Sequence, residues 1–195
     1  MGINGFGTIT PLGQILKVEN ALVTEVFLRS RITGYLGIIF AWPEVNEDFA
    51  ESLRLNASFD TDILNSSGQH MCLCDIKEGM WIDSLFSPIM ENRIPPQSNA
   101  YLIVARNYNQ PPLNFTIDRI AKVDINNFLL YTGDPDNEDN QIKFTISSAT
   151  SIRDKNGYPA PFRSLRPGLS VHITHSEVQT EDIPHHADAF HIQAL

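Results

Sequence analysis

Histidines and acids gather toward the end of the chain, where their spacing could support metal chemistry. The residues are His172, His175, His185, His186 and His191, with Glu177, Glu181, Asp182 and Asp188 among them. Imidazole nitrogens and carboxylate oxygens are ligands of zinc sites. His172 and His175, however, fall on opposite faces of an extended strand and make a poor chelating pair. We expect solvated surface histidines and no metal; His185, His186 and His191 are the weak zinc candidates.

Cys72 and Cys74 form the segment Cys-Leu-Cys and are the two cysteines of the chain. Alternate positions on a strand point the same way, a geometry poorly suited to a mutual disulfide. We therefore expect two reduced, partly buried thiols. A bond to another subunit or to a metal is the alternative. Two cysteines are also too few for a disulfide framework.

The remaining candidate chemistry is weaker. Asp134, Asp136, Glu138 and Asp139 offer hard oxygens suited to Ca²⁺. The segment lacks the glycine and the final glutamate of a helix-loop-helix calcium site, so we expect a solvated loop. The sequence contains no Gly-x-Ser-x-Gly, no His-Glu-x-x-His and no phosphate-binding loop. We expect no enzyme and no cofactor.

The glycine cluster Gly2-Ile3-Asn4-Gly5-Phe6-Gly7 resembles the start of a phosphorylating aldehyde dehydrogenase. That fingerprint needs a strand before the glycines and an uninterrupted helix after them, where it holds a pyrophosphate. Only Met1 precedes the cluster, and Pro11 and Gly13 follow it closely. The cluster therefore does not predict a dinucleotide site.

The composition favours many short strands. With 195 residues and 42% hydrophobic content, the chain can form one medium domain or two small ones. The charged fraction is 19%, and turn-forming residues are plentiful, as in all-β proteins. The net charge of −9, without a basic cluster, argues against a nucleic-acid partner.

No targeting segment is visible in the sequence. There is no apolar run long enough for a membrane span and no secretory leader. We expect synthesis in the cytoplasm, with transfer to a spore or the cell surface by another route left open.

Two parts of the chain resemble each other at a constant spacing of 89 residues. Ile94-Pro95-Pro96 matches Ile183-Pro184-His185. A one-residue shift extends the similarity upstream, where Ser30-Arg31-Ile32 matches Asp118-Arg119-Ile120. Such self-similarity indicates a repeat. We predict copies at residues 29–106 and 115–195, joined by a linker at 107–114.

Each copy contains about five short strands, which predicts a small β-barrel. Asn65–Gly68 and Asp154–Gly157 are expected to form hairpin turns. The first strand of copy one is expected at residues 32–40. The predicted fold is all-β: two tandem small OB-like barrels preceded by a β-rich arm at residues 1–28.

Two groups of segments carry a family resemblance. Thr150-Ser151-Ile152 and Leu165 to Val171 resemble the pattern of a widespread bacterial family of small barrels of unknown function. Ser87-Pro88-Ile89-Met90 and Ile94-Pro95-Pro96-Gln97 resemble repeats in uncharacterised proteins of spore-forming Gram-positive bacteria. The resemblance implies a fold and brings no catalytic residue.

Copy one is apolar where copy two is polar. Leu102 and Val104 stand at the positions of His191 and Gln193. A strand that is apolar on both faces must be covered on both. Residues 1–28, also apolar, either add strands to copy one or cover its Trp81 face, which we favour, or they complete the sheet of a neighbour. The candidate assembly interface comprises Trp81, Leu85, Leu102, Val104, Ile15, Val18, Val23 and Phe27.

We therefore predict a structural, self-assembling subunit whose partner is the protein itself, as a homo-oligomer or filament of a surface layer or spore. The alternative is a non-enzymatic binding module for a protein or small ligand, using the histidine-rich end of copy two.

Overall fold

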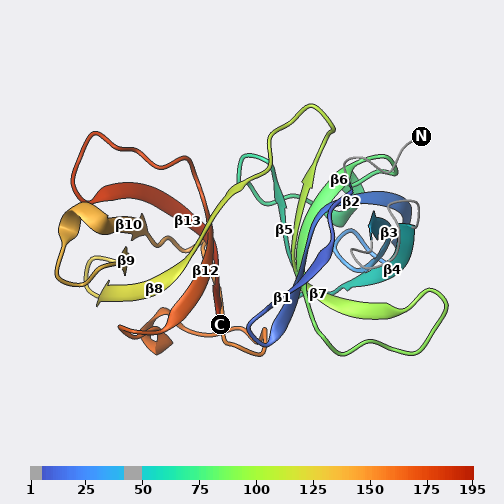
Figure 1. Cartoon of the computed structure of the whole chain (residues 1–195). Helices are drawn as coiled ribbons and strands as arrows, with labels where there is room; N and C mark the ends of the chain where they lie inside the picture. The colour runs from blue at the N-terminus through green and yellow to red at the C-terminus, as the bar shows by residue number, and fades with distance from the viewer. Residues whose placement is uncertain (1–5, 42–49) are drawn as a thin grey trace. The chain divides into compact units, whose positions relative to one another are not determined.

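The computed structural model describes residues 6–41 and 50–195, and the chain divides into two units, Met1–Pro112 and Leu113–Leu195. Both units are built from β-strands, which confirms the prediction of an all-β fold with two barrel units (Figure 1). The helices in the described residues are three short 3-10 turns. None of them is long and apolar enough to cross a bilayer.

Unit one contains barrel one, which five strands close. They pair in the cyclic order β2-β3-β4-β7-β6 and back to β2, with a parallel contact between β4 and β7. β1 extends the sheet beside β2, and β5 pairs with β7. The elements are β1 (Ile9–Leu12), β2 (Ile15–Leu28), β3 (Gly34–Ala41), β4 (Ala50–Ala57), β5 (Asp62–Asn65), η1 (Leu73–Asp75), β6 (Trp81–Phe86) and β7 (Gln97–Arg106).

Unit two contains barrel two, which has the same plan. Its cyclic order is β8-β9-β10-β13-β12 and back to β8, with a parallel contact between β10 and β13. β11 pairs with β13, as β5 does with β7. The elements are β8 (Asn114–Asp124), β9 (Leu129–Gly133), η2 (Glu138–Asn140), β10 (Gln141–Thr145), β11 (Ser151–Arg153), η3 (Phe162–Ser164), β12 (Ser170–His175) and β13 (His185–Ala194).

The N-terminal segment adds strands to barrel one, as favoured above. β2 pairs with both β3 and β6 and so closes the barrel. The segment is thus not separate from copy one: β2 is the first barrel strand, and the strand expected at residues 32–40 is the second, β3.

Backbone hydrogen bonds correct the upstream alignment of the two copies. The Val23 carbonyl accepts from the Gly79 N–H (2.9 Å), just as the Ile120 carbonyl accepts from the Gly168 N–H (2.7 Å). Val23 therefore corresponds to Ile120, whereas Ile32 lies in the turn between β2 and β3. The one-residue shift of the prediction was wrong because β2 carries register shifts that change the spacing.

Alternating side chains fill each barrel. In β4, Leu53, Leu55 and Ala57 are buried in the core, and Arg54 and Asn56 between them are more exposed. Each barrel has its own core cluster; Phe144 is central to the second. Alternation therefore places polar residues of β4 on the outer face of barrel one.

The barrels share local features at the predicted spacing of 89 residues. The Thr61 hydroxyl donates to the Ala100 carbonyl (2.8 Å), and the Thr150 hydroxyl donates to the Ala189 carbonyl (2.7 Å). Gly79 and Gly168 both adopt a positive φ, 88° and 86°. L-residues rarely adopt this conformation, so glycine is needed in both turns.

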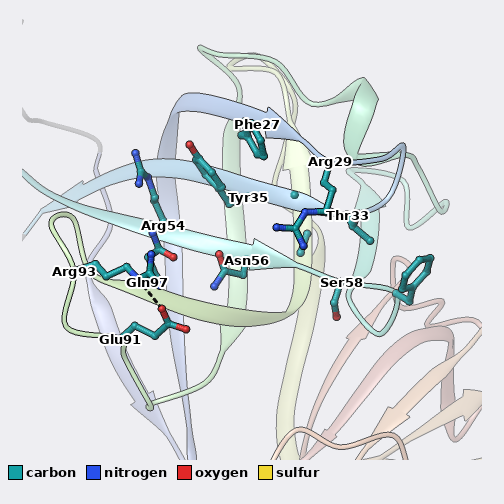
Figure 2. A pocket seen from close by; sticks show the side chains of 13 residues that line it. Phe27, Arg29, Thr33, Tyr35, Arg54, Asn56, Ser58, Glu91, Arg93 and Gln97 are labelled. Atoms are coloured by element: carbon teal, nitrogen blue, oxygen red, sulfur yellow. Dashed lines mark ion pairs between the residues drawn. The ribbon is translucent and has the colours of Figure 1, made fainter.

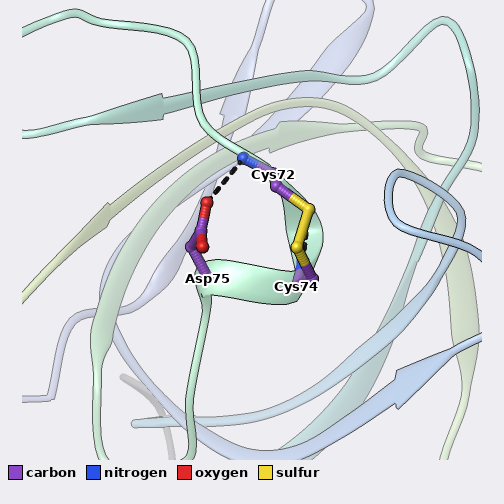
Figure 3. A group of neighbouring side chains, drawn as sticks. All are labelled: Cys72, Cys74 and Asp75. Atoms are coloured by element: carbon purple, nitrogen blue, oxygen red, sulfur yellow. Dashed lines mark hydrogen bonds between the residues drawn. A yellow bond between two sulfur atoms is a disulfide. The ribbon is translucent and has the colours of Figure 1, made fainter.

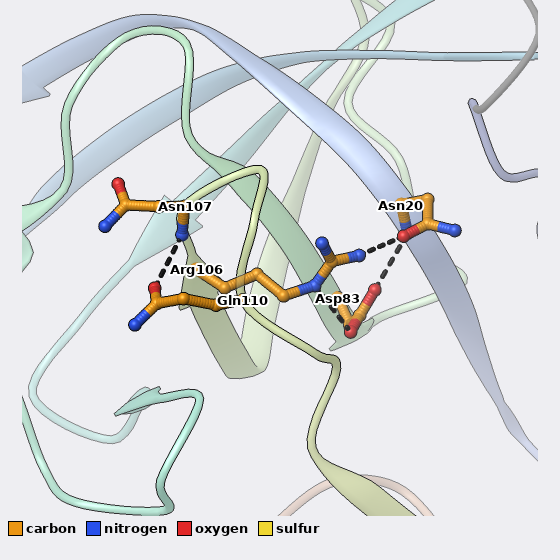
Figure 4. Close-up of polar contacts among 5 residues, drawn as sticks. All are labelled: Asn20, Asp83, Arg106, Asn107 and Gln110. Carbon is orange, nitrogen blue, oxygen red and sulfur yellow. Dashed lines mark hydrogen bonds and ion pairs between the residues drawn. The ribbon is translucent and has the colours of Figure 1, made fainter.

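A polar cluster around the buried Arg106 ties the bulge of β2 to β6 and β7 (Figure 4). Asn20, at φ 49°, donates its backbone N–H to Asp83 Oδ1 (2.8 Å). Arg106 donates to the Asn20 side-chain oxygen, and its Nε lies 3.9 Å from Asp83 Oδ2. Burial raises the pKa of Asp83, because the charged carboxylate loses water. Arg106 compensates that charge inside unit one.

Gly7 is the one glycine of the N-terminal cluster that lies in the described residues, and its contacts show why glycine is needed there. Gly2 and Gly5 lie outside the described residues. The Gly7 N–H donates to the Asn20 carbonyl (3.1 Å), and a Cβ at Gly7 would collide with the Glu19 carbonyl. The next element is the strand β1 and not a helix. Here glycine permits close contact between two backbones.

Candidate functional site

The structure does not bring the predicted histidine ligands together. His191 is fully buried on β13, where its Nδ1 lies 2.6 Å from the Ser151 hydroxyl. His185 and His186 are consecutive on β13 and only half-buried. In the described residues, the one group of three or more metal-ligating side chains lies elsewhere, at Cys72, Cys74 and Asp75.

His172 and His175 are buried, which corrects the expectation of solvated histidines. His175 Nδ1 lies 2.6 Å from the Ser176 carbonyl, and its Nε2 lies 2.9 Å from the Thr116 hydroxyl. These partners fit a neutral ring that donates from Nδ1 and accepts at Nε2. Burial lowers the pKa of His175, because the charged ring would lose water.

Most of the candidate assembly interface is buried within this chain. Val18 and Val23 belong to the core of barrel one. Four more of the predicted interface residues are at most 3% exposed: Ile15, Leu85, Leu102 and Val104. Trp81 is half-buried near Phe6 and Tyr108, and Phe27 is 49% exposed. Val18 and Val23 lie in the core of barrel one, so a neighbouring subunit cannot contact them.

The two cysteines form a disulfide, with Cα atoms 5.0 Å apart (Figure 3). The prediction of two reduced thiols was wrong because it placed them on a strand. Cys72 instead caps the 3-10 turn η1, and the turn brings Cys74 next to it. The Asp75 carboxylate accepts from the Cys72 N–H (3.1 Å) and completes the cap.

The acidic segment before β10 is an exposed loop, as expected. Asp134 Oδ1 accepts from the Asp136 N–H (2.9 Å), and the Asn137 side chain accepts from the Asp139 N–H (3.1 Å). These bonds hold turns at the surface and do not gather the carboxylates around one point.

A polar groove on barrel one, which the sequence did not indicate, is the best candidate site. It has a volume of about 670 Å³ and lies over β3 and β4 (Figure 2). The turn after β2 borders it on one side, and the loop between β6 and β7 borders it on the other. Its lining includes Phe27, Arg29, Thr33, Tyr35, Arg54, Asn56, Phe59, Glu91, Arg93 and Gln97.

Three guanidinium groups line this groove in a protein of net charge −9. Arg54 pairs with Glu25 (3.3 Å), and Arg93 pairs with Glu91 (2.9 Å). Arg29 forms no ion pair with any residue that the structure describes. Three cations against two carboxylates leave the groove with a net charge of about +1.

Aromatic rings form the other part of the groove. Phe27 and Tyr35 stack with their centroids 5.0 Å apart, and the Arg54 guanidinium lies 4.7 Å from the Tyr35 centroid. The Tyr35 hydroxyl donates to Glu25 (2.9 Å), and this bond raises the pKa of Tyr35. Phe59 is 80% exposed at the rim. The groove thus offers flat apolar surface beside positive charge.

Barrel two keeps one of these charges and reverses another. Arg54 corresponds to Lys143, because Arg54 pairs with Gln97 as Lys143 pairs with His186, whereas Arg93 corresponds to Asp182. Comparison of the copies at Arg93 could therefore have indicated the site. Comparisons of the chain with protein-family models, with curated proteins and with solved structures found no match. The resemblance to bacterial small barrels stays a prediction.

Proposed function

We propose that the protein is a non-enzymatic binding module whose groove on barrel one holds a short acidic oligosaccharide. The observation that carries the proposal is the combination of Arg29, Arg93 and the Phe27–Tyr35 stack in one groove. Guanidinium groups bind carboxylates through paired hydrogen bonds, and aromatic faces pack against rings.

The strand order supports this location of the site. In each barrel the first strand pairs with the second and fourth, and the third pairs in parallel with the fifth. This order is the one expected of an OB-like barrel, and it supports the proposal. OB barrels bind oligosaccharides and oligonucleotides over the second and third strands and the adjoining loops. In barrel one those strands are β3 and β4.

The charge of the groove favours a sugar over a nucleic acid. A net charge of about +1 suits a short sugar with few acidic groups, such as a trisaccharide of three uronic acids, whereas a nucleic acid presents a phosphate at every nucleotide. Asn56 and Gln97 add side-chain amides, which can bind hydroxyl groups.

The lining also supports binding without catalysis. Glycosidases use a pair of carboxyl groups. The described groove is lined by a single carboxylate, Glu91, which is paired with Arg93 (2.9 Å). Self-assembly remains the second prediction, and Phe27, 49% exposed, is its most accessible contact.

Calorimetric titration with trigalacturonate tests the proposal. Arg29→Gln and Arg93→Gln should each weaken binding by about tenfold, because each removes a charge-assisted hydrogen bond. Lys143→Gln is the matched control, since it makes the same change of net charge on barrel two. The sugar should be recovered intact.

Two results would contradict the proposal. One is equal binding by the groove variants and the Lys143→Gln control. The other is tighter binding of hexathymidine than of trigalacturonate, with affinity falling steeply as salt is added.

A further inference from the structure

The turn η1 carries three potential metal ligands that the fold itself does not require. In barrel two the matching turn, η3, has Pro161 and Arg163 at the positions of Cys72 and Cys74. It forms without a side-chain cap. The two cysteines of η1 are therefore additional to a turn that the barrel makes without them.

The turn is anchored in the core of barrel one. Leu73, between the cysteines, is fully buried, and Ile76 after the turn is 3% exposed, both in the core of barrel one. The Cys74 N–H also donates to the Arg31 carbonyl (3.3 Å). The burial of Leu73 and Ile76 thus fixes the backbone of the turn without the sulfur atoms, whereas the Cys74 N–H is shared between the Arg31 carbonyl and Cys72 Sγ.

The ligand atoms of the turn converge at the surface. The sulfur atoms of Cys72 and Cys74 and a carboxylate oxygen of Asp75 all lie within 4.8 Å of one another. Two ligands of a tetrahedral zinc ion with Zn–S bonds of about 2.3 Å are about 3.8 Å apart. In this structure the two sulfur atoms are bonded to each other, so they must separate to this spacing after reduction before they can hold such an ion.

The surroundings of the turn leave room for a fourth ligand. The Cys74 N–H lies 3.1 Å from Cys72 Sγ and would stabilise a thiolate, whereas the Arg31 carbonyl, 2.7 Å from the same sulfur, would favour a thiol or a bound cation. Cys72 and Asp75 face an open cavity that His70 and Met71 also line. A site with three protein ligands keeps one position open to water or another ligand.

We propose that Cys72, Cys74 and Asp75 form a redox-gated site for a divalent zinc-like cation. In the oxidised protein the two sulfur atoms are bonded to each other and cannot act as thiolate ligands. A dithiol reductant supplies two electrons and two protons, the sulfur–sulfur bond breaks, two thiols form, and the reductant becomes a disulfide. The cation then binds both sulfurs as thiolates and releases their two protons.

Cobalt titration of the whole protein provides the test. After reduction with a phosphine and removal of oxygen, Co²⁺ should bind with a stoichiometry of one per chain. It should show thiolate-to-cobalt absorption and the visible bands of tetrahedral Co²⁺. Added Zn²⁺ should displace it. The oxidised protein should show neither absorption.

Variants separate the site from general binding. Cys72→Ser/Cys74→Ser should lose the thiolate absorption, and η3 indicates that this variant folds; circular dichroism checks it. Asp75→Asn should weaken binding by about tenfold. Asp136→Asn, an exposed carboxylate on barrel two, is the control and should bind as the unmodified protein does. Equal cobalt spectra in the reduced protein and in Cys72→Ser/Cys74→Ser would overturn the proposal.

Discussion

Replacing Arg106 with methionine should destabilise unit one strongly, because it leaves Asp83 without its cation. The Arg106 side chain is 7% exposed and that of Asp83 is 21% exposed. Two unit charges about 4 Å apart interact by about 4 kcal/mol at an effective dielectric constant of about 20. Partial exposure of Asp83 reduces this value, so we expect a loss of about 3 kcal/mol.

Urea unfolding followed by tryptophan fluorescence is a suitable assay. Both tryptophans, Trp42 and Trp81, belong to unit one, so their emission reports on that unit. With a slope of about 2 kcal/mol per molar urea, the unfolding midpoint should fall by about 1.5 M. The loss of unfolding free energy caused by Arg106→Met should be smaller below neutral pH, because protonation removes the uncompensated charge of Asp83.

Asp83→Asn supplies the control, since asparagine keeps an acceptor for the Asn20 N–H. In the unmodified protein this change should destabilise, because it leaves Arg106 buried without a carboxylate. In the Arg106→Met background it should instead stabilise, because it removes the lone charge. The same effect of Asp83→Asn in both backgrounds would refute the reasoning.

Two further predictions concern unit two and are read by circular dichroism. The lowered pKa of His175 means that the unfolded chain takes up a proton below about pH 6.5 that the folded ring does not. Stability should therefore fall as the pH drops through that value, and less so in His175→Gln; equal slopes would contradict this. Gly168→Ala should cost about 1 kcal/mol from its positive φ alone, since no atom lies within 4 Å of the added Cβ. Gly133→Ala should cost about 3 kcal/mol, because its Cβ would also collide with the Asn140 carbonyl; similar losses for both glycines would be inconsistent with this collision.

The fold class was predictable because turn glycines and strand alternation are local properties. Gly79 and Gly168 occupy matching turns, and Leu53 and Leu55 alternate with partly buried polar residues, as the pattern requires. The first strand was missed because β2 is 14 residues long and irregular in register, whereas β8 has 11 residues. A constant spacing cannot follow such a change of length.

The groove was not predictable from local patterns, because its residues converge only after the barrel closes. Arg29 comes from the turn after β2, Arg54 from β4, and Arg93 from the loop before β7. The cysteines were misjudged for a related reason. A three-residue 3-10 turn leaves little trace in a segment that also alternates like a strand.

The parallel contacts of β4 with β7 and of β10 with β13 affect the order of events during translation. Neither barrel can close until its last strand has been made, because that strand completes the ring. Barrel one has all its strands once Arg106 has left the ribosome, so it can fold while unit two is still being synthesised. Barrel two must wait for β13, and a nascent chain stalled before it would expose the open edges of β10 and β12.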